Sequence, residues 1–362
     1  MAILHEATKE VICKIVYHGT GMCGKTTSLM YLNHHLPPSQ RGKFISLETP
    51  TERTLYFDFL PVITEARGYK FRYLCFTTPG QDYYEASRKL VLKGADGIVF
   101  VVDSQRERMS ENLTSLQLLE KNLGEMGQRP DYLPTVVQYN KRDLPSAMPL
   151  DEAEKRFNPK HQMSFPAVAK TGQGVYETFL SIAKMALTKL TSADGEHRMA
   201  EAFRTIVITA DDATRFRTQL ARLLESSGAS GAMLVDESSS MLAQQGEVPA
   251  QDHETLGALL ACNFTAAQEL AHNMSGQGFT GIVQKGATRS LLAVRVDGRR
   301  FLVVQHPRDV DPRRLRDAVM IAKGTLGAGL MQMDQMSASR LARFGEVFTS
   351  VSRIAMAGMS AA

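Results

Sequence analysis

The 362-residue sequence lacks a long apolar run, a block of like charge and a leader-like N-terminus. No apolar stretch approaches the roughly 20 residues that cross a bilayer. The first residues do not combine a charged region with an apolar one. Lysine and arginine number 42 against 38 acidic residues, with both signs mixed along the chain. We therefore expect no membrane span, no secretory signal and no nucleic-acid partner.

Cysteine is also scarce, and its placement argues against two kinds of site. The four cysteines, Cys13, Cys23, Cys75 and Cys262, have unrelated spacings, whereas zinc sites and disulfide frameworks need patterned ones. The nine histidines form no ligand spacing either. Reduced cysteines suit a cytoplasmic protein, and a chain of this length suggests two domains.

A glycine-rich segment with a lysine is the most informative feature present. Residues 19–26 read Gly, four free residues, then Gly-Lys-Thr, between a strand-like run at 11–17 and a helix-like run from 27 to 36. Such a loop wraps backbone N–H groups around a polyphosphate, and the helix behind it adds positive dipole. The alternative is a chance match in a turn, which the strand and helix disfavour. The predicted phosphate-binding residues are Gly19, Gly21, Cys23, Gly24, Lys25, Thr26 and Thr27.

Two side chains of this loop have distinct predicted roles. Lys25 would reach the β- and γ-phosphates of a nucleotide, and Thr26 would offer its hydroxyl to Mg²⁺.

Strand-like and helix-like stretches alternate from residue 11 to about 190, which predicts an α/β domain with a mostly parallel sheet and helices on both faces. Ligands of such sheets bind at the carboxyl ends of the strands, where these motifs fall.

A second motif, Asn-Lys-Arg-Asp at residues 140–143, follows the buried strand predicted at 135–139. The Asp143 carboxylate would accept two N–H bonds from guanine. Adenine offers no matching pair of donors, so a buried Asp143 would be left unpaired against it. Asn140 would tie this segment to the phosphate loop, and the Lys141 stem would cover a base face. Ala169 and Lys170 end the next strand-like run, where the Ala169 N–H would meet the guanine O6.

Residues 77–81, Thr-Thr-Pro-Gly-Gln, end the strand predicted at 71–76. The Gly80 N–H would contact the γ-phosphate, and Gln81 would orient the attacking water. A Pro-Gly turn without function is the alternative. Between the first helix and the second strand, Thr54 would supply a second oxygen to Mg²⁺, and Arg53 would supply positive charge to the transition state. The alternative for Arg53 is a solvated loop arginine.

Together these residues resemble a Ras-like small GTPase, and more closely the bacterial MglA type, over about residues 8–190. The resemblance implies a P-loop GTPase domain that binds GTP or GDP with Mg²⁺ and hydrolyses GTP with Arg53 and Gln81 as the catalytic pair. Most small GTPases have Asp where this chain has Thr77, whereas MglA-type proteins have Thr. Asp58 is one candidate substitute for that carboxylate. An ATP-using enzyme is disfavoured by the motif at 140–143.

The composition changes after Leu190, where a polar segment reads as a linker. Asp211 or Asp212 would cap a helix that runs to about Ser226. Two short strands, a helix, three strands and another helix follow, and Asp297-Gly298 is a hairpin signal. This order predicts an α+β module with an antiparallel sheet. The predicted parts are a GTPase domain at 1–190, a linker at 191–203, the module at 204–335 and an amphipathic tail at 336–362.

The second module resembles the roadblock / dynein light chain family over about residues 205–330. The resemblance implies homodimers, and the MglB type within this family accelerates hydrolysis by MglA-type GTPases without supplying an arginine. We therefore expect a cytoplasmic GTPase switch in polarity or motility, regulated within one chain or across the dimer, with roadblock, polarity or motility proteins as partners. The module would alternatively only dimerise, and a scaffold with negligible hydrolysis is the alternative function. The tail would pack on the module or dock a partner.

Overall fold

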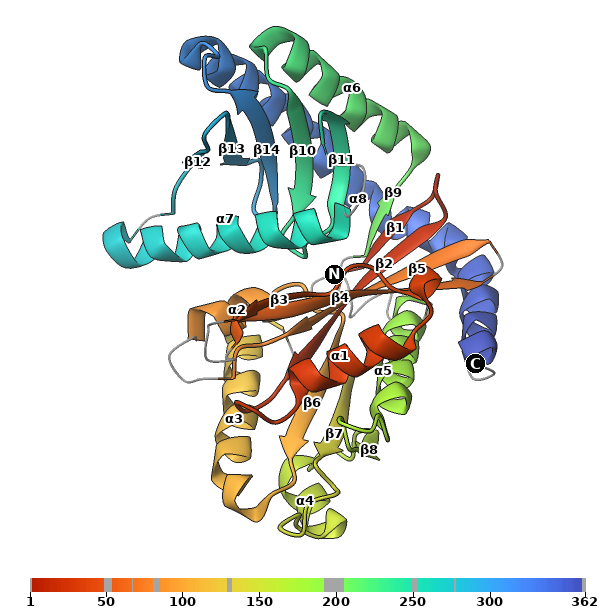
Figure 1. The fold of residues 1–362 in the computed structure, drawn as a ribbon. Helices are drawn as coiled ribbons and strands as arrows, with labels where there is room; N and C mark the ends of the chain where they lie inside the picture. The colour runs from red at the N-terminus through yellow and green to blue at the C-terminus, as the bar shows by residue number, and fades with distance from the viewer. Residues whose placement is uncertain are drawn as a thin grey trace. The chain divides into compact units, whose positions relative to one another are not determined.

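The computed structural model describes residues 2–48, 54–66, 68–80, 85–128, 132–191, 205–248, 253–276 and 278–359. The chain forms two compact units (Figure 1). The first unit comprises Lys9–Thr205 with Met1–Ala2 and Ala342–Ala362, and the second comprises Ile3–Thr8 and Ile206–Leu341. Among the described residues, no helix is both long and apolar enough to cross a membrane.

The first unit is built on a mostly parallel sheet with the strand order β3-β4-β5-β2-β6-β7-β8. The pairs from β5 through β2, β6 and β7 to β8 are parallel, whereas β3, β4 and β5 pair antiparallel at one edge. This confirms the predicted α/β class. The strands are β2 (Glu10–His18), β3 (Ile45–Glu48), β4 (Thr54–Ala66), β5 (Tyr69–Thr77), β6 (Gly97–Asp103), β7 (Thr135–Asn140) and β8 (Ser164–Pro166).

Helices cover both faces of this sheet (Figure 1), which is why residues 98–102 of β6 form an unbroken apolar run and every residue of the strand is buried. A Cβ on Gly97 would lie 2.9 Å from the Ile182 side chain, so glycine lets α5 approach β6 closely. The helices are α1 (Lys25–His35), α2 (Glu85–Leu92), α3 (Met109–Glu125), α4 (Leu150–Phe157) and α5 (Val175–Thr191), with short 3₁₀ turns η1 (Pro38–Gln40) and η3 (Arg106–Arg108).

The second unit has an antiparallel sheet with the order β11-β10-β14-β13-β12, as the α+β prediction requires. A core of Met233, Val235, Phe264, Phe301 and neighbouring residues lies between the sheet and α7. The elements are β1 (Ile3–His5), β9 (Ile206–Ile208), α6 (Ala210–Ser227), β10 (Gly231–Asp236), β11 (Met241–Gly246), α7 (His253–Ser275), β12 (Gly281–Lys285), β13 (Arg289–Arg295), β14 (Arg300–Pro307) and the part of α8 (Pro312–Met359) up to Leu341.

Local signals explain several of these boundaries. The Asp297 carboxylate accepts the N–H groups of Arg299 and Arg300 at 2.8 Å, which closes the turn between β13 and β14 at the expected hairpin. The N-cap of α6 is Thr209, whose hydroxyl accepts the Asp212 N–H at 3.2 Å. The predicted cap was Asp211 or Asp212. Asp212 instead sits at the third helical position and completes a capping box.

Two features differ from the predicted domain boundaries. The first strand of the chain, β1, pairs in parallel with β9, Ile3 opposite Ile206, and so groups with the second unit. The helix α8 runs from Pro312 to Met359 without a break at residue 336. Buried Leu326, Leu330 and Met333 hold its middle part in the second unit. Apart from Thr191, the predicted linker at 191–203 lies outside the described residues.

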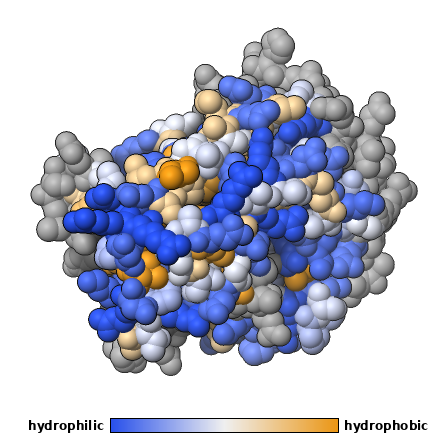
Figure 2. All heavy atoms as spheres, turned by 90° about the horizontal axis from the view of Figure 1, so that it is seen from above, coloured by the Kyte–Doolittle hydropathy of each residue, from blue (hydrophilic) through white to orange (hydrophobic). Residues whose placement is uncertain are grey.

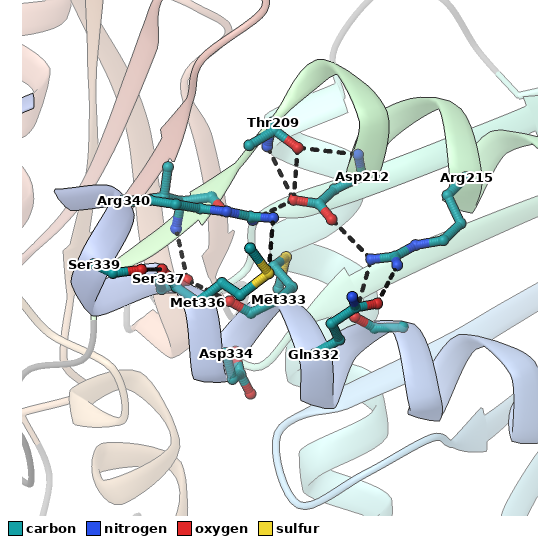
Figure 3. A network of polar contacts seen from close by, with 12 residues as sticks. Thr209, Asp212, Arg215, Gln332, Met333, Asp334, Met336, Ser337, Ser339 and Arg340 are labelled. Atoms are coloured by element: carbon teal, nitrogen blue, oxygen red, sulfur yellow. Dashed lines mark hydrogen bonds and ion pairs between the residues drawn. The ribbon is translucent and has the colours of Figure 1, made fainter. Parts of the chain in front are cut away.

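Figure 3 shows how α8 is attached to the start of α6 within the second unit. The Arg340 guanidinium donates to the Asp212 carboxylate and, at 3.0 Å, to the Val207 carbonyl. The Ser337 hydroxyl accepts the Val207 N–H at 3.1 Å.

In the view of Figure 2, hydrophilic residues make up most of the surface, and hydrophobic residues form small separate areas.

Candidate functional site

The predicted phosphate loop joins the end of β2 to the start of α1, in the arrangement that the sequence implied. Two of its glycines have backbone angles that favour glycine, with φ of 156° at Gly19 and 105° at Gly24. A Cβ at Gly19 would lie 2.2 Å from the Val101 carbonyl oxygen, and a Cβ at Gly24 would lie 2.0 Å from the Asn140 amide nitrogen. Both positions therefore exclude larger residues.

The loop closes around the side chain of Lys25. Its ammonium group donates to the carbonyl oxygens of Gly19 at 2.9 Å and Thr20 at 2.6 Å, and Lys25 is buried. The N-cap residue of α1 is Gly24, which has no side chain to cap the helix, and the helix begins at Lys25. A buried cation and an uncapped helix N-terminus thus lie together, and both attract a polyphosphate.

A carboxylate surrounded by hydroxyl groups lies next to this loop. The fully buried Asp58 accepts from Thr26 Oγ1 at 2.5 Å, from Thr77 Oγ1 at 2.8 Å and from Ser46 Oγ at 2.6 Å. The Asp58 N–H in turn donates to Thr77 Oγ1 at 2.8 Å. This geometry joins Thr77 and Thr26 to Asp58, which the sequence analysis named as one candidate substitute for the missing aspartate. Such an oxygen-rich set fits Mg²⁺, a hard cation that prefers oxygen.

Asn140 connects the phosphate loop to the predicted base-binding segments. Its Nδ2 donates to the Cys23 carbonyl at 2.7 Å, and its Oδ1 accepts the Ala169 N–H at 2.8 Å. The tie to the phosphate loop is the one predicted. The Ala169 amide, however, was assigned to guanine O6, and in this structure it is bonded to Asn140. A base would have to share this donor.

The remaining base-site residues lie around the loop after β7. Asp143 and Lys170 are exposed. This differs from the prediction of a buried Asp143 carboxylate, because the loop after β7 leaves that side chain at the surface when no base covers it. Lys141 has φ of 64°, and its ammonium group pairs with the buried Asp103 carboxylate at 2.7 Å. Asp103 ends β6 and Lys141 follows the last residue of β7, so this ion pair lies at the carboxyl ends of the two strands.

Gly80 packs against the phosphate loop, since a Cβ there would lie 2.4 Å from Gly21 Cα. The predicted catalytic residues Arg53 and Gln81 lie outside the described residues. Thr54 begins β4 opposite Glu48, but its side chain also lies outside the described part. The structure therefore shows the predicted phosphate and base segments joined through Asn140, and the predicted catalytic pair lies outside the described residues.

Sequence reasoning missed His18, which ends β2 immediately before the loop. Its Nδ1 lies 3.0 Å from the Thr78 hydroxyl and its Nε2 lies 3.2 Å from the Ser115 carbonyl. Burial, reinforced by the positive charge of Lys25, lowers the pKa of His18 to about 3, so the ring is neutral. A neutral ring donates from Nε2 and accepts at Nδ1, which links the loop to Thr78 and α3. The signal in the sequence that could have identified His18 was its position immediately before the glycine-rich loop.

Family models match both parts of the chain. The Ras family model matches residues 14–188 and the Roadblock/LC7 domain model matches residues 215–306. "Mutual gliding-motility protein MglA" of Myxococcus xanthus (strain DK1622) is 50% identical over 191 residues, covering 52% of this chain and 98% of that protein. "Ras-related protein RABE1e" of Arabidopsis thaliana is 28% identical over 144 residues, covering 39% of this chain and 64% of that protein.

Solved structures also resemble part of the chain. "Myxococcus xanthus MglB" has 24% identity and a TM-score of 0.32, covering 33% of this chain and 90% of that structure. The gliding protein mglB from Thermus thermophilus has 22% identity and a TM-score of 0.33, covering 36% and 99%. The roadblock assignment depends on the family model, since these scores are too low to support it. From the MglA identity and the two family models, this chain belongs to the Ras family through an MglA-like N-terminal domain, which is followed by a Roadblock/LC7 domain.

Proposed function

We propose that this protein binds GTP and GDP in the loop at 19–26 and hydrolyses GTP to GDP and phosphate as a molecular switch. The observation that carries the proposal is the bridging amide of Asn140, bonded to Cys23 in the phosphate loop and to Ala169 beside the base motif. This bridge connects the phosphate loop to the base motif, which supports one nucleotide site that spans both segments. Membership of the Ras family supports the same activity.

The positive charge that balances the negative phosphates would come from the chain and from a metal ion. Lys25 and the N-terminus of α1 would hold the β- and γ-phosphates, with Lys25 turning from the carbonyls it contacts now. Thr26 and Thr54 are the proposed Mg²⁺ ligands, and Asp58 would orient Thr26 through their 2.5 Å hydrogen bond. When bound, the ion would neutralise charge that develops on the phosphate oxygens.

Base selection is proposed for the exposed Asp143, whose carboxylate would accept the N1 and N2 hydrogens of guanine. Because adenine has no such donor pair, ATP would leave the carboxylate unpaired once the base covers it. Competition of GTP and ATP against a fluorescent GDP analogue tests this step. Equal displacement by both nucleotides would remove Asp143 from its proposed role.

Hydrolysis is proposed to depend on Gln81, which would align the attacking water, and on Arg53, which would offset charge in the transition state. In a single-turnover assay, Gln81→Ala should retain GTP binding and hydrolyse at least about a hundredfold more slowly, the low end of what a group that positions the reacting water contributes. Unchanged turnover would remove Gln81 from the mechanism. A wild-type protein that binds GTP and never hydrolyses it would favour the nucleotide-gated scaffold instead.

The Roadblock/LC7 domain is proposed to dimerise the protein and to regulate hydrolysis, in one chain or across the dimer. Support comes from the presence of a Roadblock/LC7 domain and an MglA-like domain in one chain. A cytoplasmic role in polarity or gliding motility, with roadblock, polarity or motility proteins as partners, is part of the proposal. The name of the MglA relative supports the motility component.

A further inference from the structure

Arg108 makes a contact with the phosphate loop that none of the roles above uses. It ends the 3₁₀ turn η3 that follows β6, at the start of α3. Its Nη2 donates to the Gly21 carbonyl oxygen at 2.8 Å, across 87 residues of sequence. An arginine from the segment that follows β6 therefore binds a carbonyl in the middle of the loop.

The guanidinium is held in place by two acidic residues. Its Nη1 lies 2.5 Å from a Glu111 carboxylate oxygen, and its Nε lies 3.9 Å from Asp103 Oδ2. The same Asp103 oxygen accepts from Lys141 at 2.7 Å, so Arg108 also joins the phosphate loop to the base motif. With these contacts on two nitrogens, the planar fork directs its third nitrogen at Gly21.

The peptide that Arg108 holds also carries a donor on its opposite side. The bond between Gly21 and Met22 is trans, so the Met22 N–H points away from the carbonyl and from Arg108. Met22 has φ of 62° and is 86% exposed, so its side chain does not fill the inside of the loop, which is lined there by the backbone. A cation on the carbonyl fixes this peptide and polarises its N–H, which strengthens that N–H as a donor.

We propose that Arg108 is a positioning residue for the phosphate loop, which raises nucleotide affinity by fixing the Gly21–Met22 peptide with its N–H toward the polyphosphate. The inference rests on the proposed function of the loop as a nucleotide site. It adds a cation that acts through the backbone, whereas Lys25 acts on the phosphates directly.

The test is the affinity of the full-length protein for fluorescent GDP and GTP analogues with Mg²⁺. Arg108→Ala should raise both dissociation constants by about tenfold, the expected effect of losing one hydrogen bond from a charged donor. Arg108→Lys keeps a cation and a donor and should regain at least half of that loss on a logarithmic scale. The matched control is Arg106→Ala in the same turn, because exposed Arg106 pairs with Glu152 at 3.1 Å and should not affect affinity.

Ionic strength separates a held peptide from general attraction between charges. The tenfold difference should persist when salt is raised, whereas long-range attraction would be screened. The proposal is overturned if Arg108→Ala binds within twofold of wild type, if Arg106→Ala loses as much, or if Arg108→Lys regains nothing. Should Arg108→Ala fail to fold by circular dichroism, Arg108→Gln replaces it with the same expected direction of change. A wild type that binds neither analogue would instead refute the proposed function.

Discussion

Asp58 occupies the position around which the oxygen atoms of the candidate metal site are arranged. Its carboxylate accepts hydrogen bonds from Thr26, Thr77 and Ser46, which come from α1, β5 and β3. Because Thr77 donates to this carboxylate, the chain keeps an acidic group behind the threonine where most small GTPases place their aspartate. In this chain the carboxylate comes from β4, the strand next to β5, which carries Thr77.

Replacing this carboxylate should weaken metal-dependent nucleotide retention. Asp58→Asn should raise the Mg²⁺ concentration for half-maximal retention of a fluorescent GDP analogue by about tenfold, as expected for a group that orients a metal ligand. Glu65→Gln is the matched control, because exposed Glu65 is on the same strand and pairs only loosely with Lys70, at 3.7 Å. An unchanged Mg²⁺ requirement in Asp58→Asn would contradict this role.

His18 predicts a pH dependence of stability. Its pKa is lowered from 6.5 to about 3, mainly by burial, so below pH 6.5 the unfolded chain takes up a proton that the folded chain does not. Stability from this site is therefore complete above pH 6.5 and is lost as the pH falls toward 3. Between pH 7 and pH 5 the loss should be about 2 kcal/mol.

Denaturant unfolding of wild type and His18→Gln at pH 7 and pH 5 measures this contribution. The carboxylates titrate in both proteins, so the difference isolates the histidine. Wild type should lose about 2 kcal/mol more than His18→Gln between the two pH values. Equal losses of stability in the two proteins would show that folding does not lower the pKa of His18, and would contradict this prediction.

At the scale of elements, the sequence predicted those whose signal is local. The buried run of β6 and the strand, loop and helix around Lys25 were found where expected, because burial on both faces and a glycine-rich turn are visible in a few residues. The strand β1 was missed, because three residues are too few to show an alternating hydrophobic pattern and its partner β9 is about 200 residues away in the sequence. The Asn140 bond to Ala169 also depends on tertiary placement.

The uninterrupted helix α8 was missed for a related reason, since its attachment to α6 is made by long-range side-chain contacts. Arg340→Ala should destabilise the protein by about 3 kcal/mol, because it leaves buried Asp212 without its closest cation. The control Arg316→Ala, exposed on the same helix beside Asp317, should change stability by less than about 0.5 kcal/mol. Chemical denaturation of both variants measures this, and equal effects would contradict the contact in Figure 3.

At the scale of the whole molecule, the proposed dimer predicts a mass in solution. One chain has a mass of 40.0 kDa, so sedimentation equilibrium at micromolar concentration should give twice that value. A mass of one chain over the same concentrations would contradict dimerisation. It would leave nucleotide binding untouched, because Lys25, Asp58 and Asn140 all belong to the first unit.

The most direct measurement of the central claim is calorimetric titration of the Mg²⁺-supplied protein with GTP, GDP and ATP. The account predicts one site per chain for GTP and GDP, no comparable heat from ATP, and loss of binding in Lys25→Ala, which removes the cation held by the Gly19 and Thr20 carbonyls. Absence of heat from both guanine nucleotides, or equal binding of ATP, would contradict it.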